Sequence, residues 1–401
     1  MTDSSIRPPR GGQGKERLPV AALLALAMTG FICIATETLP AGLLPQMAQG
    51  LSVSQSMAGQ TVAAYALGSL VAAIPLTLLT QSWSRRAVLL LTVFGFLAFN
   101  SLTALSESYW LTMVARFMAG AAAGLAWSLL AGYARRMVEP HQQGRAMALA
   151  MVGTPIALSL GVPLGTWLGT AIGWRMAFGI MSVMTIGLIV WILAAVPNYP
   201  GQKGSSDISL GRVASLPGVQ AVLAVVVFWM LAHNILYTYI APYAARAGME
   251  ERVDLVLLVF GIAALIGIWI TGRVIDRALR RSVLGALSAF ALTGLVLTLF
   301  GTIPAVLLIA VAIWGVTFGG AATQLQTALA DTAGDGSDIA LSMNVVVWNA
   351  AIAGGSMIGG ILLDKGGAAA FPPVVIILAL IALGIAFLAR KSGFPSGARR
   401  A

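Results

Sequence analysis

The chain has 401 residues, of which 58% are hydrophobic and 9% are charged. A soluble domain carries about 25% charged residues, so a water-soluble fold of this size would lack the charges to cover its surface. The composition therefore excludes a soluble enzyme, a disordered chain and a nucleic-acid-binding domain, and it predicts a polytopic membrane protein in contact with lipid. One cysteine and two histidines are too few for a disulfide or a clustered metal site, so we expect no metal and no cofactor.

Twelve apolar runs approach the length of about 20 residues that a helix needs to cross the bilayer. They cover residues 19–44, 55–80, 87–106, 110–133, 145–171, 174–197, 217–245, 253–272, 282–302, 304–329, 338–363 and 371–390. The segment 198–216 is rich in Gly, Ser and Pro and predicts a linker between two six-helix bundles. We therefore expect an all-α membrane protein with bundles over 19–197 and 217–390, and with tails over 1–18 and 391–401.

The Lys and Arg residues predict how the chain is oriented in the membrane. Cytoplasmic loops carry an excess of these residues. If the N-terminus is inside, nineteen of the 24 Lys and Arg fall inside, four fall outside, and Arg116 lies within a span. We therefore expect a multi-pass protein of the inner (plasma) membrane with both termini in the cytoplasm, and we attribute the net charge of +10 to topology.

The two halves resemble each other at an offset of about 195 residues. The matching small residues are Gly120 and Gly124 with Gly315 and Gly319, and Ala157, Gly161 and Gly165 with Ala351, Gly355 and Gly359. Repeated halves around a site at the middle of the membrane are typical of secondary transporters. Small residues every fourth position also let membrane helices pack closely, which explains the pattern by packing alone.

Two charged residues lie inside apolar runs, Glu37 in the first and Arg116 in the fourth. A charge within the membrane is costly and indicates function. At 1.5 Å per residue both residues fall at a similar depth in the outer half of the membrane, so we expect them to be neighbours. Three interpretations remain open: an ion pair that fixes two helices, a carboxylate that loads and releases a proton, and a carboxylate that binds a cationic solute.

A second polar group lies in the seventh run, where His233 and Tyr237 share one helix face. His233 is either a hydrogen-bonding core residue or a proton carrier. Aromatic and amide groups in an otherwise apolar cavity suit an amphipathic organic solute. The candidates for the lining of such a cavity are Tyr65, Asn100, Trp127, His233, Asn234, Tyr237, Gln324, Asn344 and Trp348.

Several motifs resemble those of the major facilitator superfamily. Residues 272–281 (GRVIDRALRR) resemble the family's loop signature between spans 8 and 9, although the loop after span 2 has Gln81 where an acidic residue is expected. The run Arg116, Gly120 and Gly124 resembles the span-4 signature associated with proton transfer. Residues 153–165, with Gly153, Pro155, Gly161, Pro163 and Gly165, resemble the span-5 signature of antiporters.

Residues 36–62 and 169–178 resemble, within this family, the bacterial drug:proton antiporters that export sugars, purine nucleosides and chloramphenicol. The resemblance implies proton-coupled export of a small organic solute, with Glu37 and Arg116 as the coupling pair. It also implies a cytoplasmic gate of cross-half charge pairs. The gate and hinge candidates are Arg85, Arg86, Arg145, Gly272, Asp276, Arg277 and Asp338, together with the span-5 glycines and prolines.

We expect a monomer that works by alternating access on a small-molecule substrate and protons, with no nucleic-acid partner and no enzymatic activity. An uncoupled facilitator or importer is the alternative within the same class. A membrane-embedded transferase is a remote alternative, because it would need a cluster of catalytic groups near one surface.

Overall fold

The computed structural model describes residues 18–201, 210–395 and 397. Within these residues every regular element is a helix, and eleven helices are long and apolar enough to span a membrane. The helix α13 (Val253–Phe300) has 48 residues with non-helical backbone angles at Ala278, so it holds two spans joined at a kink. The eleven helices therefore supply the twelve crossings that the sequence predicts.

The first half of the chain contains α1 to α9. Their bounds are α1 Val20–Gly42, α2 Leu44–Gly50, α3 Gln55–Thr80, α4 Arg85–Leu105, α5 Tyr109–Arg136, α6 Gln143–Met151, α7 Gly153–Ile156, α8 Val162–Ile172 and α9 Trp174–Ala195. A 3-10 turn covers Pro140–Gln142, and a π-helical segment, η2, covers Ala157–Gly161.

The second half contains α10 to α17. Besides α13, their bounds are α10 Leu210–Ala214, α11 Pro217–Thr238, α12 Ile240–Ala245, α14 Pro304–Gly319, α15 Ala321–Ala333, α16 Ser337–Gly366 and α17 Phe371–Leu388. Three 3-10 turns cover Glu250–Arg252, Gly334–Gly336 and Ala368–Ala370. The short α10 lies within the predicted linker, and residues 202–209 of that linker are outside the described residues.

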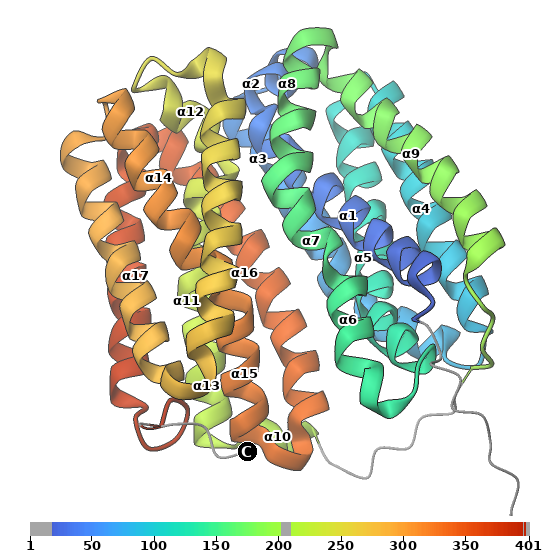
Figure 1. The fold of residues 1–401 in the computed structure, drawn as a ribbon. Helices are drawn as coiled ribbons and strands as arrows, with labels where there is room; N and C mark the ends of the chain where they lie inside the picture. Colours follow the sequence, from blue (N-terminus) through green and yellow to red (C-terminus); the bar gives the residue numbers. More distant parts are fainter. Residues whose placement is uncertain (1–17, 202–209, 396, 398–401) are drawn as a thin grey trace, which may run out of the picture.

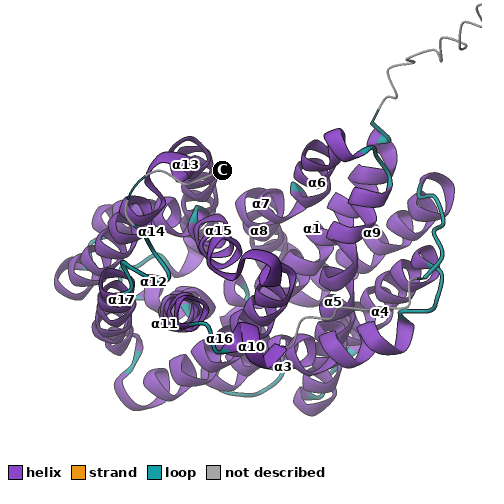
Figure 2. Ribbon diagram, turned by 90° about the horizontal axis from the view of Figure 1, so that it is seen from below, coloured by secondary structure: helices purple, strands orange, loops and turns teal. Residues whose placement is uncertain are grey.

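Helices α1 to α9 pack together, as do α11 to α17, and the two groups stand side by side (Figures 1 and 2). They meet where α3 packs against α16 and where α13 packs against α8 and η2. We call the end of the bundle that carries α2, α8 and α12 the α12 end, which is uppermost in Figure 1. The opposite end, which carries α6, α10 and α15, is the α10 end.

Glycine contacts repeat between the two groups of helices. Gly120 of α5 lies against the backbone of Tyr65 in α3, so that a Cβ at this position would meet the Tyr65 carbonyl. Its counterpart in the repeat, Gly315 of α14, lies in the same way against the backbone of Phe260 in α13, so that a Cβ there would meet the Phe260 carbonyl. Such close approach of backbones is how membrane helices associate without a hydrophobic driving force. The matching small residues of the sequence therefore occupy equivalent helix contacts.

The predicted fifth span, 145–171, is not one continuous helix. It is divided into α6, α7, η2 and α8. Proline has no backbone N–H, so Pro155 and Pro163 each remove a helical hydrogen bond on either side of η2. A π-helical turn within an α-helix is frequent at functional sites. The two prolines, which are expected from the sequence to kink this span, thus flank a local change from α-helix to π-helix.

The broken span lies between α1 and the second half of the chain. Gly153 packs against the backbone of Ala27, and Gly161 packs against the ring of Phe31, both in α1. On the other side, Gly261 of α13 packs against the backbone of Ser159 in η2. The span therefore connects the charged helix α1 to the other group of helices.

Candidate functional site

Glu37 lies near the end of α1, and 9% of its surface is exposed. Among the described residues, no group forms a hydrogen bond or a salt bridge within 4.0 Å with its carboxylate. Glu37 is therefore a largely buried carboxylate that can take up a proton or accept hydrogen bonds from a solute.

Arg116 of α5 is fully buried and lies directly beside Glu37. Its Nη1 donates to the Thr36 carbonyl at 2.6 Å, its Nη2 to the Glu37 carbonyl at 3.2 Å, and its Nε to the Thr61 carbonyl at 3.3 Å. The structure thus brings the two charged residues together, through the backbone of Glu37 and not through its carboxylate. Of the three interpretations left open by the sequence, the ion pair is not found: the Glu37 carboxylate and the Arg116 guanidinium form no direct pair in this structure.

A proline explains why the guanidinium is held at this point of α1. Pro40 lies inside the helix and has no N–H to donate to the carbonyl of Thr36, four residues earlier. A buried carbonyl without a partner is costly. The Nη1 of Arg116 supplies the missing donor. The Arg116 side chain therefore fixes α1 at the position next to Glu37.

Aromatic and amide side chains complete the surroundings of Arg116. The guanidinium carbon lies 4.9 Å from the centre of the Tyr65 ring and 5.6 Å from that of Phe178, within cation–π range. The Tyr65 hydroxyl donates to the Cys33 carbonyl at 2.9 Å. The Asn100 Nδ2 donates to the Thr36 hydroxyl at 3.0 Å. Tyr65 and Asn100 thus support α1 from within the first half.

His233 of α11 lies in an aromatic cluster of the second half. The Trp314 indole Nε1 donates to its Nδ1 at 3.2 Å, so the imidazole accepts at Nδ1 and carries its hydrogen on Nε2. The Phe318 ring lies parallel to the imidazole, with centres 3.5 Å apart. Only 5% of His233 is exposed. This environment favours the interpretation of His233 as a hydrogen-bonding core residue.

Tyr237 belongs to the same cluster, and its ring stacks on His233 with centres 5.2 Å apart. It is 4% exposed, and its hydroxyl lies beside the Thr38 side chain of α1, in the other half of the chain. Tyr237 therefore joins the aromatic cluster of the second half to α1, one residue along from Glu37.

The remaining predicted cavity residues divide into three groups. The Asn234 Nδ2 donates to the Met230 carbonyl of its own helix, and the Gln324 Nε2 bonds the Ser282 hydroxyl at 2.7 Å, so it joins α15 to α13. Asn344 is 2% exposed and its Oδ1 has no partner within the described part of the chain. Trp127 and Trp348 are half-buried.

The predicted gate residues lie at the α10 end. Arg85 donates through Nη2 to the Gln81 carbonyl, and the backbone N–H of Arg86 donates to the Asn198 side chain, both within the first half. Arg145 of α6 and the pair Asp276 and Arg277 of α13 are exposed.

The other two gate and hinge candidates add no contact to this picture. Gly272 is exposed, and a Cβ there would meet nothing within 4 Å. The side chain of Asp338 lies outside the described residues.

Sequence reasoning misses a polar network that joins the halves near the α12 end. The Ser56 hydroxyl of α3 donates to Oδ2 of Asp364 in α16 at 2.8 Å. The Tyr239 hydroxyl donates to the Ser356 carbonyl at 2.8 Å, and the Gln60 Nε2 donates to the same carbonyl at 3.3 Å. The polar residues are visible in the sequence, but their pairing depends on how α3 packs against α16.

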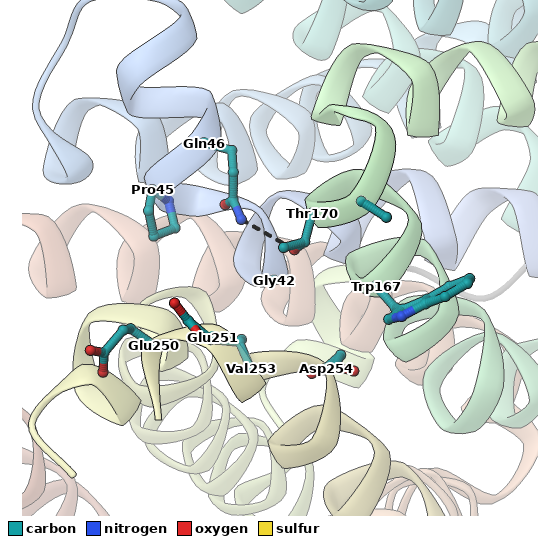
Figure 3. Close-up of a pocket in the computed structure, with 10 residues that line it drawn as sticks. Gly42, Pro45, Gln46, Trp167, Thr170, Glu250, Glu251, Val253 and Asp254 are labelled. Atoms are coloured by element: carbon teal, nitrogen blue, oxygen red, sulfur yellow. Dashed lines mark hydrogen bonds between the residues drawn. The ribbon is translucent and has the colours of Figure 1, made fainter. Parts of the chain in front are cut away.

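A cavity of about 360 Å³ opens at the same end, between the two halves (Figure 3). It is lined by Gly42, Pro45, Gln46, Trp167, Thr170, Ala171, Glu250, Glu251, Val253 and Asp254. The Gln46 Nε2 bonds the Thr170 hydroxyl at 3.2 Å across its first-half wall. The three carboxylates all come from the start of α13 and the turn before it, so the second-half wall is acidic.

Twelve membrane crossings in two alike groups, with a buried acid where the groups meet, define a multi-pass membrane transporter. The family model of the Major Facilitator Superfamily matches residues 26–337, and the chain belongs to that family. It is thus a membrane transporter of a small molecule and not an enzyme.

Curated relatives match along most of their length. Purine ribonucleoside efflux pumps of Shigella sonnei (strain Ss046) and Escherichia coli (strain K12) are each 31% identical over 358 residues, which cover 89% of this chain and 90% of theirs. The chain also resembles the crystal structure of a bacterial homolog of the human lysosomal transporter Spinster, in an inward-facing and unoccupied conformation. That likeness has a TM-score of 0.68 at 14% identity, covers 98% of this chain and 100% of the other, and shows a shared fold.

Proposed function

We propose that this transporter exports a small organic solute in exchange for protons, and that a purine ribonucleoside is the first solute to test. The names of the relatives support both the export and the solute. The observation that carries the coupling is the largely buried carboxylate of Glu37, whose own backbone carbonyl accepts a hydrogen bond from Arg116.

A shared carboxylate provides a simple route to exchange. Ionised Glu37 accepts charge-assisted hydrogen bonds from a solute, whereas protonation removes the charge and turns one oxygen into a donor, which weakens binding of the same solute donors. Proton and solute therefore compete for one group. Arg116 keeps the carboxylate in place in both states, because its hydrogen bonds go to carbonyl oxygens that do not titrate.

The polar network near the α12 end supports alternating access. Ser56, Gln60 and Tyr239 each contribute a hydrogen bond that links the two halves there. We propose that the α12 end faces the outside and is closed in this conformation, with both termini in the cytoplasm, residues 198–216 as the linker between the two bundles, and a single chain as the working unit. Partly exposed hydrogen bonds of this kind are worth about 1 kcal/mol each, so their loss is a small barrier to opening.

The test uses inverted membrane vesicles and a labelled purine ribonucleoside. An acidic lumen should drive accumulation in vesicles with the wild-type protein, and a protonophore should abolish it. Glu37→Gln should abolish gradient-driven accumulation but still exchange labelled for unlabelled solute. Glu107→Gln, an equal change at an exposed site between α4 and α5, is the matched control and should behave as wild type.

Two results contradict the proposal. If Glu37→Gln accumulates solute as well as wild type under the same gradient, Glu37 is not the coupling group. If wild-type vesicles equilibrate the solute equally with and without the gradient, the protein is an uncoupled facilitator, the alternative that the sequence left open.

A further inference from the structure

Tyr239 is a large side chain buried where the two halves of the chain meet near the α12 end. It belongs to the second half, lies at the break between α11 and α12, and is 0% exposed. Pro242, three residues further on, has no N–H to donate to the Thr238 carbonyl, which allows the helix to break at this point. The Tyr239 ring is therefore carried by a break in the seventh span, and its surroundings fix its position.

Three glycines, which we call the glycine notch, surround the Tyr239 ring. Gly359 and Gly360 of α16 come from the same half as the tyrosine, and Gly59 of α3 comes from the other half. A Cβ added at any of the three would lie less than 3 Å from an atom of the Tyr239 side chain, closer than real Cβ atoms come to their neighbours. The ring therefore fits at this seam only because these three residues have no side chain.

The internal repeat shows which of these contacts belongs to packing within one half. In the first half, Gly165 of α8 lies against the Leu39 side chain of α1, as its counterpart Gly359 lies against Tyr239. A glycine that receives a side chain of its own half is thus common to both halves. The contact between Tyr239 and Gly59 is different, because it crosses from the second half to the first. It is lost if the two halves move apart at this end.

The Tyr239 hydroxyl is also bonded from both halves. It lies 2.8 Å from the Ser356 carbonyl of its own half and 3.3 Å from the Ser56 carbonyl of the other, so its one hydrogen is shared between two acceptors. The Gln60 Nε2 of α3 donates to the hydroxyl oxygen at 3.3 Å. If the halves separate at this end, the bond to Ser356 remains, whereas the bonds to Ser56 and Gln60 are broken.

We propose that Tyr239 and the glycine notch form a latch that holds the two halves together at the α12 end, and that Gly59 makes the latch specific for the closed conformation. Only interactions that differ between two conformations shift the balance between them. The contacts of Tyr239 within its own half are common to both conformations, whereas its fit against Gly59 exists only in the closed one. The latch goes beyond the proposed function, because it needs neither a particular solute nor protons, and it rests only on closure at this end.

Distance measurements between two spin labels test the latch without any solute. Gln49 of α2 and Arg252 of the turn before α13 are exposed residues at the α12 end, one in each half. Gln49→Cys and Arg252→Cys carry the labels in a protein whose native cysteine is removed by Cys33→Ala. Double electron–electron resonance on the purified protein in lipid nanodiscs gives the populations with short and long distances between the labels. The wild type should show mainly the short distance.

Gly59→Ala adds a methyl group that collides with the Tyr239 ring only when the α12 end is closed. It should raise the ratio of the long-distance to the short-distance population by about tenfold. Gly187→Ala in α9 is the matched control, because a Cβ there would meet nothing within 4 Å, and it should keep the wild-type ratio. Tyr239→Phe keeps the ring but loses the bonds to Ser56 and Gln60, so it should raise the ratio by a few fold.

A double variant shows whether the collision with the ring is the cause. Tyr239→Ala removes the ring, so adding Gly59→Ala to it should change the ratio by less than about twofold. If Gly59→Ala has the same effect with and without the ring, or none in the wild type, the latch is wrong and the exporter proposal stands. If the wild type shows mainly the long distance, closure at the α12 end fails and the latch fails with it. If Gly59→Ala does not fold, Tyr239→Phe decides, since an unchanged ratio overturns the latch.

Discussion

Replacing Gly120 with alanine should destabilise the transporter, although the same change in an open helix stabilises. The added Cβ would meet the backbone carbonyl of Tyr65, which cannot rotate away as a side chain can. Overpacking of this kind costs about 1–3 kcal/mol. Alanine gains about 0.5–1 kcal/mol over glycine within a helix. The expected net effect is a loss of about 1–2 kcal/mol.

Gly132 provides the control on the same helix, because a Cβ there would meet nothing within 4 Å. Gly132→Ala should therefore be neutral or stabilising by up to about 1 kcal/mol. The two variants should differ by about 1–3 kcal/mol in unfolding free energy, or by at least about 2 °C in Tm. Thermal unfolding of both purified proteins in one detergent measures this difference. If Gly120→Ala unfolds at the same temperature as Gly132→Ala, α3 and α5 are not in close backbone contact at Gly120, and the reasoning is refuted.

Three further predictions concern α5, α14 and the α12 end. Arg116→Lys keeps the charge, but a lysine cannot bond three carbonyls at once, so the unfolding free energy should fall by about 2–4 kcal/mol. Arg135→Lys, the same change at an exposed site, should leave the Tm in the same thermal unfolding measurement almost unchanged. Gly315→Ala, at the counterpart of Gly120, should lower the Tm as Gly120→Ala does, and a Tm at or above wild type would argue against the equivalence of the two halves. Ser56→Ala removes a hydrogen bond to Asp364 and should increase, by a few fold, the labelling of a cysteine introduced in place of the buried Ser356; unchanged labelling would mean that the bond does not hold this end closed.

Composition and apolar periodicity predict the fold well, because membrane spans are set by length and hydrophobicity. All twelve predicted crossings occur in the structure within a few residues. The expected loop after span 8 is the exception. Residues 273–281 form no extended loop, because the two spans meet at a kink at Ala278, where the backbone angles are not helical.

The site is predicted only in part, because pairing depends on tertiary packing. The rarity of intramembrane charge identifies Glu37 and Arg116, and the structure places them together. The sequence also contains Pro40, yet nothing in it indicates that the carbonyl freed by this proline is where the guanidinium binds. Ser56 and Asp364 lie 308 positions apart, so neither residue predicts the other.

Solute-induced proton release tests the central claim most directly. The purified transporter is mixed with a purine ribonucleoside in weakly buffered detergent solution that contains a pH indicator. If solute binding and proton binding compete for the Glu37 carboxylate, the wild-type protein releases protons when solute binds, and Glu37→Gln binds solute without releasing any. Proton release that is equal in the two proteins, or absent from a wild-type protein that demonstrably binds solute, would contradict the account.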